Sequence, residues 1–138
     1  MPFNVAVLDE AGYGGLDPDL ATRLCAAAFS HRGFDVERLG EVSVALVEPD
    51  VIRDLNLRFR GKDEPTDVLS FEVDGPYGEM VGEVVICPTC ASPEMGVWEL
   101  VVHGALHLSG MKHGEDFEGS EMALAQEAAM GVARGEQR

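Results

Sequence analysis

Segments with the composition of β-strands alternate with segments of helical periodicity along most of this chain. The strand-like segments are rich in apolar and β-branched residues, and we expect them at residues 3–8, 42–47, 68–73 and 81–87. The helical segments place apolar residues on one face, and we expect them at residues 18–33, 49–59, 92–110 and 118–133. This order predicts an α/β (α+β) fold in which helices pack on a small mixed four-stranded sheet.

Local signals mark several boundaries of these segments. Asp17 followed by Pro18 is a typical helix start, and Ser92 before Pro93 gives a second one. The turn-forming residues 74–78 separate the last two strands, which predicts that these strands pair as an antiparallel hairpin. Because the chain has 138 residues and domains average about 150, we expect residues 1–138 to form a single domain.

The charge balance of the chain is strongly acidic. It has 25 acidic residues against 10 basic ones, a formal net charge of −15. Such a surface repels polyanions, which argues against broad binding to DNA. One basic cluster departs from this trend, formed by Arg53, Arg58, Arg60 and Lys62. It is either a contact site for the phosphates of a nucleic acid or a solvated helix face, and charge pattern alone does not decide between them.

Cysteine content and apolar stretches point to a cytoplasmic protein. The chain has 3 cysteines, an odd number without a disulfide framework. We expect no membrane association, because no stretch approaches the ~18 apolar residues of a transmembrane helix. Cys87 and Cys90 form a Cys-x-x-Cys motif after a predicted strand, for which three explanations stay open: a redox pair, half of a second metal site, or two small residues at a strand end.

Three of the 4 histidines lie close together in the segment HGALHLSGMKH. His103 and His107 are four residues apart, so a helix places them on the same face, one turn from each other. In a continuing helix His113 would lie about 9 Å beyond His107, too far to share an ion. Gly110 can end the helix in the left-handed conformation and return the chain. We therefore predict that His103, His107 and His113 bind one metal ion.

Zinc is the ion that this ligand set favours, at one ion per chain. Neutral imidazoles suit zinc, and three protein ligands leave a fourth position open, as in catalytic sites. The spacing also occurs in metzincin proteases, but Gly104 stands where those enzymes carry a general-base glutamate, which argues against a peptidase. Glu99, one turn before His103, is either a partner of the metal ligands or an ordinary exposed helix acid.

Two blocks of the sequence are distinctive. The first is LNLRFRGKDEPTDVLSF at residues 55–71, and the second is the histidine segment HGALHLSGMKH at residues 103–113. Both resemble motifs of the YbeY family of endoribonucleases, which act in ribosomal RNA maturation. Between them, VGEVVI resembles the strand that precedes the metal-binding helix in that family. The two motifs in this order are highly specific.

The resemblance implies a zinc-dependent endoribonuclease that cleaves single-stranded ribosomal RNA. It would act in 3′-end processing of small-subunit RNA and in quality control of that subunit, with small-subunit proteins or assembly factors as partners. By position, His103, His107 and His113 would bind the zinc and Arg60 would be the catalytic cation in the cleft. A guanidinium also suits phosphate oxygens on physical grounds. The nucleophile, a water or the ribose 2′-hydroxyl, is left open.

Two other functions remain compatible with the sequence. The net charge of −15 suits docking onto basic ribosomal proteins, so the chain is alternatively a non-catalytic ribosome-assembly module with a structural zinc. A zinc hydrolase of another substrate class, in which Arg60 binds a carboxylate, is the third possibility.

Overall fold

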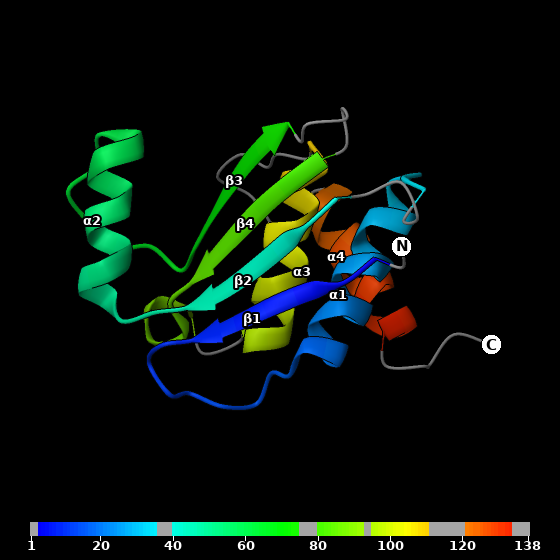
Figure 1. Ribbon diagram of the computed structural model, residues 1–138, viewed down its shortest axis with the longest axis horizontal. Helices are drawn as coiled ribbons and strands as arrows, with labels where there is room; N and C mark the ends of the chain where they lie inside the picture. Colours follow the sequence, from blue (N-terminus) through cyan, green and yellow to red (C-terminus); the bar gives the residue numbers. More distant parts are fainter. Residues whose placement is uncertain (1–2, 36–39, 75–79, 93–94, 111–120, 134–138) are drawn as a thin grey trace.

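The computed structural model describes the chain except for residues 1–2, 36–39, 75–79, 93–94, 111–120 and 134–138. Its architecture is a single mixed sheet with helices on both faces (Figure 1). The elements, in chain order, are β1 (Val5–Asp9), α1 (Pro18–His31), β2 (Val42–Leu46), α2 (Pro49–Arg60), β3 (Val68–Asp74), β4 (Met80–Ile86), the short 3-10 helix η2 (Pro88–Cys90), α3 (Val97–Leu108) and α4 (Glu121–Ala133).

The four strands lie in the order β1-β2-β4-β3. β2 runs parallel to both of its neighbours, with Val44 opposite Val7 on one side and opposite Val84 on the other. β3 is antiparallel to β4, as the short connection between them predicts, and it forms one edge of the sheet. The predicted fold class, an α/β domain with a mixed four-stranded sheet, is confirmed.

The two faces of the sheet are covered unequally. Helices α1, α3 and α4 pack on one face and enclose the larger apolar core, to which β2 contributes Val44 and Leu46. The alternate residues Ala45 and Val47 face the other side, where a smaller cluster lies beneath α2. Figure 1 shows α2 beside β3, so no helix of the described residues covers the part of this second face formed by β1 and β2. Leu8 of β1 accordingly keeps 56% of its surface exposed.

Most predicted boundaries agree with the structure to within two residues, and the predicted start of α1 is confirmed. The carboxylate of Asp17 accepts a hydrogen bond from the backbone of Leu20 at 2.8 Å. The predicted helix start at Ser92 is wrong, because α3 begins only at Val97. Residues 118–120 of the last predicted helix lie outside the described residues, and α4 is described from Glu121. In the described residues, no helix has the length and apolar character needed to cross a membrane.

Candidate functional site

His103 and His107 lie on α3 and face each other, as their spacing predicts. Their Nε2 atoms are 3.2 Å apart, and the two rings meet at an interplanar angle of 70°. His103 is only 6% exposed, whereas His107 is half-buried. The pair therefore extends from the interior of the protein toward its surface, with the two Nε2 atoms in direct contact.

This separation matches the requirements of a shared metal ion. Two nitrogen ligands at about 2.0–2.1 Å in tetrahedral geometry are about 3.3–3.4 Å apart. The described residues contain no set of three side chains that could form a metal site by themselves. The third predicted ligand, His113, lies outside the described residues.

Gln126 of α4 fixes the orientation of His103. Its Oε1 lies 3.0 Å from His103 Nδ1, so that nitrogen carries the proton and donates it. The other ring nitrogen, Nε2, is then left unprotonated and directed at His107. The amide of Gln126 also donates to the sulfur of Met95 at 3.6 Å, which fixes the amide in turn. His103 is thus held in the tautomer that binds metals through Nε2.

Gln126 was not predicted from the sequence. The residue is only 8% exposed, and a buried polar side chain requires a partner. Its sequence neighbour Ala125 and the later residues Ala129 and Met130 are buried apolar residues. A glutamine among apolar positions of a helix was therefore the available signal, but the sequence does not show which side chain it meets.

Gly104 allows α3 to approach the sheet closely beside the histidine pair. A Cβ atom built at this position would clash with Cγ1 of Val84 and lie 3.2 Å from Cγ2 of Val68. The carbonyl oxygen of Gly104 also accepts a hydrogen bond from the hydroxyl of Ser70 at 2.9 Å. Gly104, which stands where metzincin proteases carry their general-base glutamate, thus has a structural role, because it fixes the position of α3 against β3 and β4.

Gly110 has the conformation that the sequence predicts. Its φ is +100°, in the left-handed region, and α3 ends at Leu108, two residues earlier. The backbone N–H of Gly110 donates to the carbonyl of His107 at 3.0 Å. The chain therefore leaves the helix one turn after the second histidine.

Glu99, for which the sequence left open a contact with the metal ligands or an exposed position, caps the start of α3. Its carboxylate accepts a hydrogen bond from the backbone N–H of Gly96 at 2.7 Å. This contact caps the first turn of α3 and explains why the helix begins at Val97.

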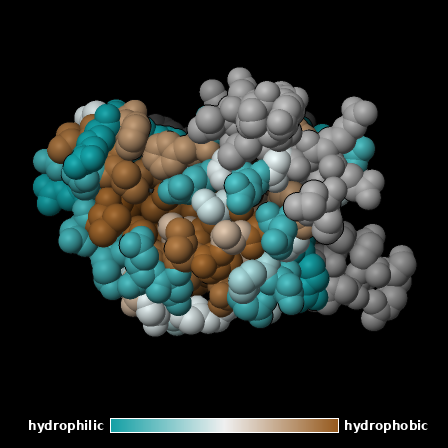
Figure 2. Space-filling model, viewed as in Figure 1, coloured by the Kyte–Doolittle hydropathy of each residue, from teal (hydrophilic) through white to brown (hydrophobic). Residues whose placement is uncertain are grey.

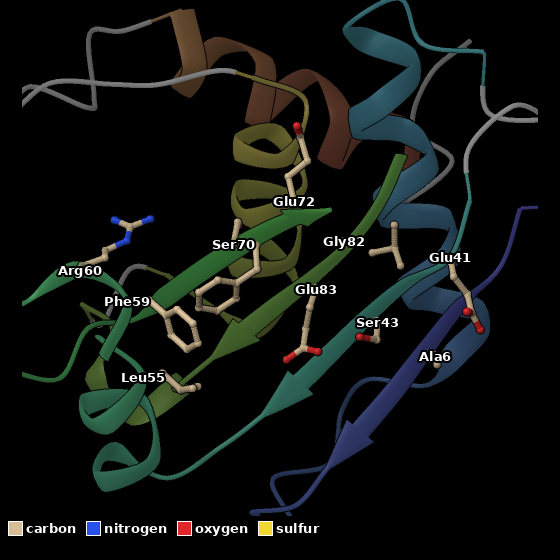
Figure 3. Close-up of a pocket in the computed structure, with 12 residues that line it drawn as sticks. Ala6, Glu41, Ser43, Leu55, Phe59, Arg60, Ser70, Glu72, Gly82 and Glu83 are labelled. Atoms are coloured by element: carbon tan, nitrogen blue, oxygen red, sulfur yellow. The ribbon is translucent and has the colours of Figure 1, made fainter. Parts of the chain in front are cut away.

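Arg60 lies in the last turn of α2, at a hollow of about 890 Å³ on the less covered face of the sheet (Figure 3). Figure 3 shows Leu55 and Phe59 of α2 on one side of this hollow, with Glu83 and Ser43 rising from the strands. The ring of Phe59 packs edge-on against Phe71, at a centroid distance of 5.1 Å. Figure 2, seen from the same side as Figure 1, shows apolar and hydrophilic surface next to each other on this face.

The basic cluster of α2 and the following loop is partly neutralised. Arg53 forms an ion pair with Asp63 at 2.8 Å. The hydrogen bond to this carboxylate and its negative charge both raise the pKa of Arg53. Arg58 pairs with Asp54 at 3.0 Å one turn away on the same helix. Arg60 is exposed, and it forms no ion pair with another residue in the described part of the chain. Arg60 is thus available to bind an anion.

Strand β3 lies between the two helices that carry Arg60 and the histidine pair. Ser70 points to one face of the strand and binds Gly104 of α3, whereas Phe71 points to the other face and packs on Phe59 of α2. Among the described residues that line the hollow there is no histidine. The helices that carry the arginine and the histidines, α2 and α3, therefore contact opposite faces of an edge strand.

Comparisons with known proteins identify the family. A model of the family described as endoribonuclease YbeY matches residues 18–133. The chain belongs to the YbeY family. It is 68% identical over 136 residues to a Rubrobacter xylanophilus protein named endoribonuclease YbeY, covering 98% of this chain and 99% of that protein. The solution structure of a Thermotoga maritima protein matches with a TM-score of 0.54 and 30% identity, over 96% of this chain and 90% of the other.

The two sequence blocks that resemble the YbeY family occupy adjoining parts of the fold. The first block runs from α2 through the following loop into β3, and the second begins in α3. Asn56 holds the loop of the first block, since its amide donates to the carbonyl of Glu64 at 2.9 Å. Both blocks meet at β3, where Ser70 of the first binds Gly104 of the second.

Proposed function

We propose that this protein is a zinc-dependent endoribonuclease that cleaves single-stranded ribosomal RNA in the cytoplasm. Membership of the YbeY family and the endoribonuclease name of a relative 68% identical in sequence support the activity. The observation that carries the proposal is the convergence of two imidazole nitrogens, 3.2 Å apart, on α3. Three cysteines without a disulfide are consistent with a reducing compartment.

We assign one zinc ion per chain to His103, His107 and His113. The nitrogen separation fits two corners of a tetrahedral site, and the Gln126 contact holds His103 in the tautomer required. A zinc ion in this position supplies a Lewis acid for a phosphate group. The half-buried position of His107 leaves the site accessible from the surface.

Arg60 is the residue that we assign to the phosphate of the substrate. Its guanidinium can donate two parallel hydrogen bonds to phosphate oxygens and stabilise the charge that develops during cleavage. Because α2 and α3 contact opposite faces of the edge strand β3, an RNA strand that passes this edge can reach both helices. Side chains reach the bases of single-stranded RNA more readily than those of a duplex, which favours a single-stranded substrate.

The acidic side of the hollow supports the proposed ribosomal partners. Glu41, Glu72 and Glu83 line it, and carboxylates attract basic ribosomal proteins. The same observation favours the alternative function, a non-catalytic assembly module. The two functions differ in whether Arg60 is needed for RNA cleavage.

Replacing Arg60 with alanine should therefore reduce the cleavage of single-stranded RNA about 100-fold, because the developing phosphate charge loses its cation. The measurement is the initial rate with the zinc-loaded protein. Arg58→Ala is the matched control: this arginine is exposed on the same helix and paired with Asp54, so we expect a rate within about twofold of the original. Equal rates for Arg60→Ala and the unmodified protein would favour the assembly module.

The ribosomal substrate is tested in cells that contain only the Arg60→Ala form. We expect small-subunit RNA with unprocessed 3′ ends to accumulate, as measured by mapping the RNA ends. Normal ends in these cells, together with the loss of cleavage in vitro, would indicate an endoribonuclease with a different RNA substrate.

The contact between Gln126 and His103 yields a separate prediction. Gln126→Leu removes the acceptor for His103 Nδ1 and should weaken zinc binding about 10- to 100-fold, as measured by competition with a chelator. Gln126→Glu keeps an acceptor oxygen and should retain most of the affinity. Equal affinities for the Leu and Glu variants would contradict the positioning role of Gln126.

A further inference from the structure

Cys87 and Cys90 are a pair of thiols in close contact at the end of β4. Their Sγ atoms are 2.9 Å apart. Two backbone hydrogen bonds fix this arrangement: Cys90 N–H donates to the carbonyl of Cys87 at 3.0 Å, and Cys87 N–H donates to the carbonyl of Asp67 at 2.8 Å. The short helix η2 thus brings the two sulfurs together without any contribution from the histidine site.

The surroundings of the two thiols differ. Cys87 is fully buried in the smaller apolar cluster, whereas Cys90 is partly exposed at its margin. Thr89, between them, lies 3.5 Å from the sulfur of Cys87, and its hydroxyl is 3.4 Å from that of Tyr13. One thiol is therefore accessible to a reagent and the other can only react with its neighbour.

Cys25, the remaining cysteine, lies in a different environment. It is fully buried on α1 in the larger core, and burial raises its pKa to about 12. Cys25 thus serves as an internal control for the oxidation of the Cys87–Cys90 pair in the same molecule.

We propose that Cys87 and Cys90 form a redox-active dithiol that a low-molecular-weight disulfide, such as oxidised glutathione, converts into an intramolecular disulfide. Cys90, as the thiolate, attacks one sulfur of the glutathione disulfide, and one glutathione leaves. The Cys87 thiol then loses its proton and attacks the Cys90 sulfur of this mixed disulfide, releasing the second glutathione. Two protein thiols are oxidised and one glutathione disulfide is reduced to two thiols.

The chemistry of this pair also predicts a slow response. Burial and the neighbouring Cys87 raise the pKa of Cys90 to about 12, against an opposing contact from Thr89, and the charge of Asp67 adds a smaller effect in the same direction as burial. Because the thiolate is the attacking species, little of it is present at neutral pH. Oxidation should therefore take place on the timescale of uncatalysed exchange and become faster as the pH rises.

The test is to expose the folded, zinc-loaded protein to excess oxidised glutathione, quench it with acid, and alkylate the remaining thiols in denaturant. Before oxidation, all 3 cysteines should be alkylated. Afterwards, we expect alkylation at Cys25 alone and, without alkylation, a mass about 2 Da lower that dithiothreitol restores. Alkylation at all three positions after prolonged exposure would overturn the proposal.

Two variants separate an internal disulfide from simple glutathionylation. Cys87→Ser should stop at a mixed disulfide on Cys90, about 305 Da heavier. In Cys90→Ser, the buried Cys87 should stay unmodified in the folded protein. Stable mixed disulfides on the unmodified protein, in place of the internal bond, would contradict the proposed resolving role of Cys87.

Discussion

Replacing His107 with alanine should remove the bound zinc and lower RNA cleavage about 1,000-fold. The ion would lose a ligand nitrogen now 3.2 Å from that of His103, and a metal contributes several kcal/mol to the transition state of such reactions. Zinc per chain, measured by elemental analysis after gel filtration, should fall well below one. Because His107 is half-buried and not part of the apolar core, the circular dichroism spectrum should stay unchanged.

His31→Ala is the matched control for this experiment. His31 is the fourth histidine of the chain and lies exposed in the last turn of α1. Its replacement should preserve both the zinc content and the cleavage rate. A His107→Ala protein that retains one zinc and its full activity would refute the assignment of His107 as a ligand.

Gly104→Ala should lower the free energy of unfolding by about 1 to 2 kcal/mol. The added Cβ would clash with Val84 and press on Val68, and overpacking of this kind costs about 1–3 kcal/mol or more. Alanine is a better helix former than glycine by about 1 kcal/mol, which offsets only part of this cost. Urea denaturation measures the change, and the shift of α3 should also reduce zinc affinity.

Two further variants test the cause of this destabilisation. In Gly96→Ala, the new Cβ would meet only the flexible side chain of Glu99, at 3.4 Å, so the loss should stay below about 1 kcal/mol. The double variant Gly104→Ala/Val84→Ala lacks the two Cγ methyl groups of Val84 with which the new Cβ would clash. The free energy of unfolding should therefore fall by less than the sum of the two single losses. Strict additivity would show that contact with Val84 is not the cause.

The parts of the site that depend on local sequence were predictable. The spacing of His103 and His107 determines that they share a helix face, and Gly110 ends that helix in the left-handed conformation. The start of α3 was mispredicted, since Ser92 followed by proline is a strong local signal. The structure instead uses the carboxylate of Glu99, which caps Gly96 from within the helix.

The parts that depend on packing between distant segments were not predictable. Gln126 meets His103 from a helix 23 residues away in sequence, and no spacing rule links the two residues. The parallel pairing of β2 with β4 arises likewise from helices packed on both faces of the sheet. The contact of α2 and α3 with opposite faces of β3 is a further result of packing between distant segments.

X-ray absorption spectroscopy of the zinc-loaded protein tests the metal assignment most directly, because nitrogen and sulfur ligands differ in distance. We predict scattering from three imidazole nitrogens at about 2.0–2.1 Å, and its loss in the His107→Ala protein. The contradicting result is sulfur scattering at about 2.3 Å that persists in the His107→Ala protein and is abolished in a Cys87→Ser/Cys90→Ser protein. This result would place the zinc at the cysteine pair and not at the histidines.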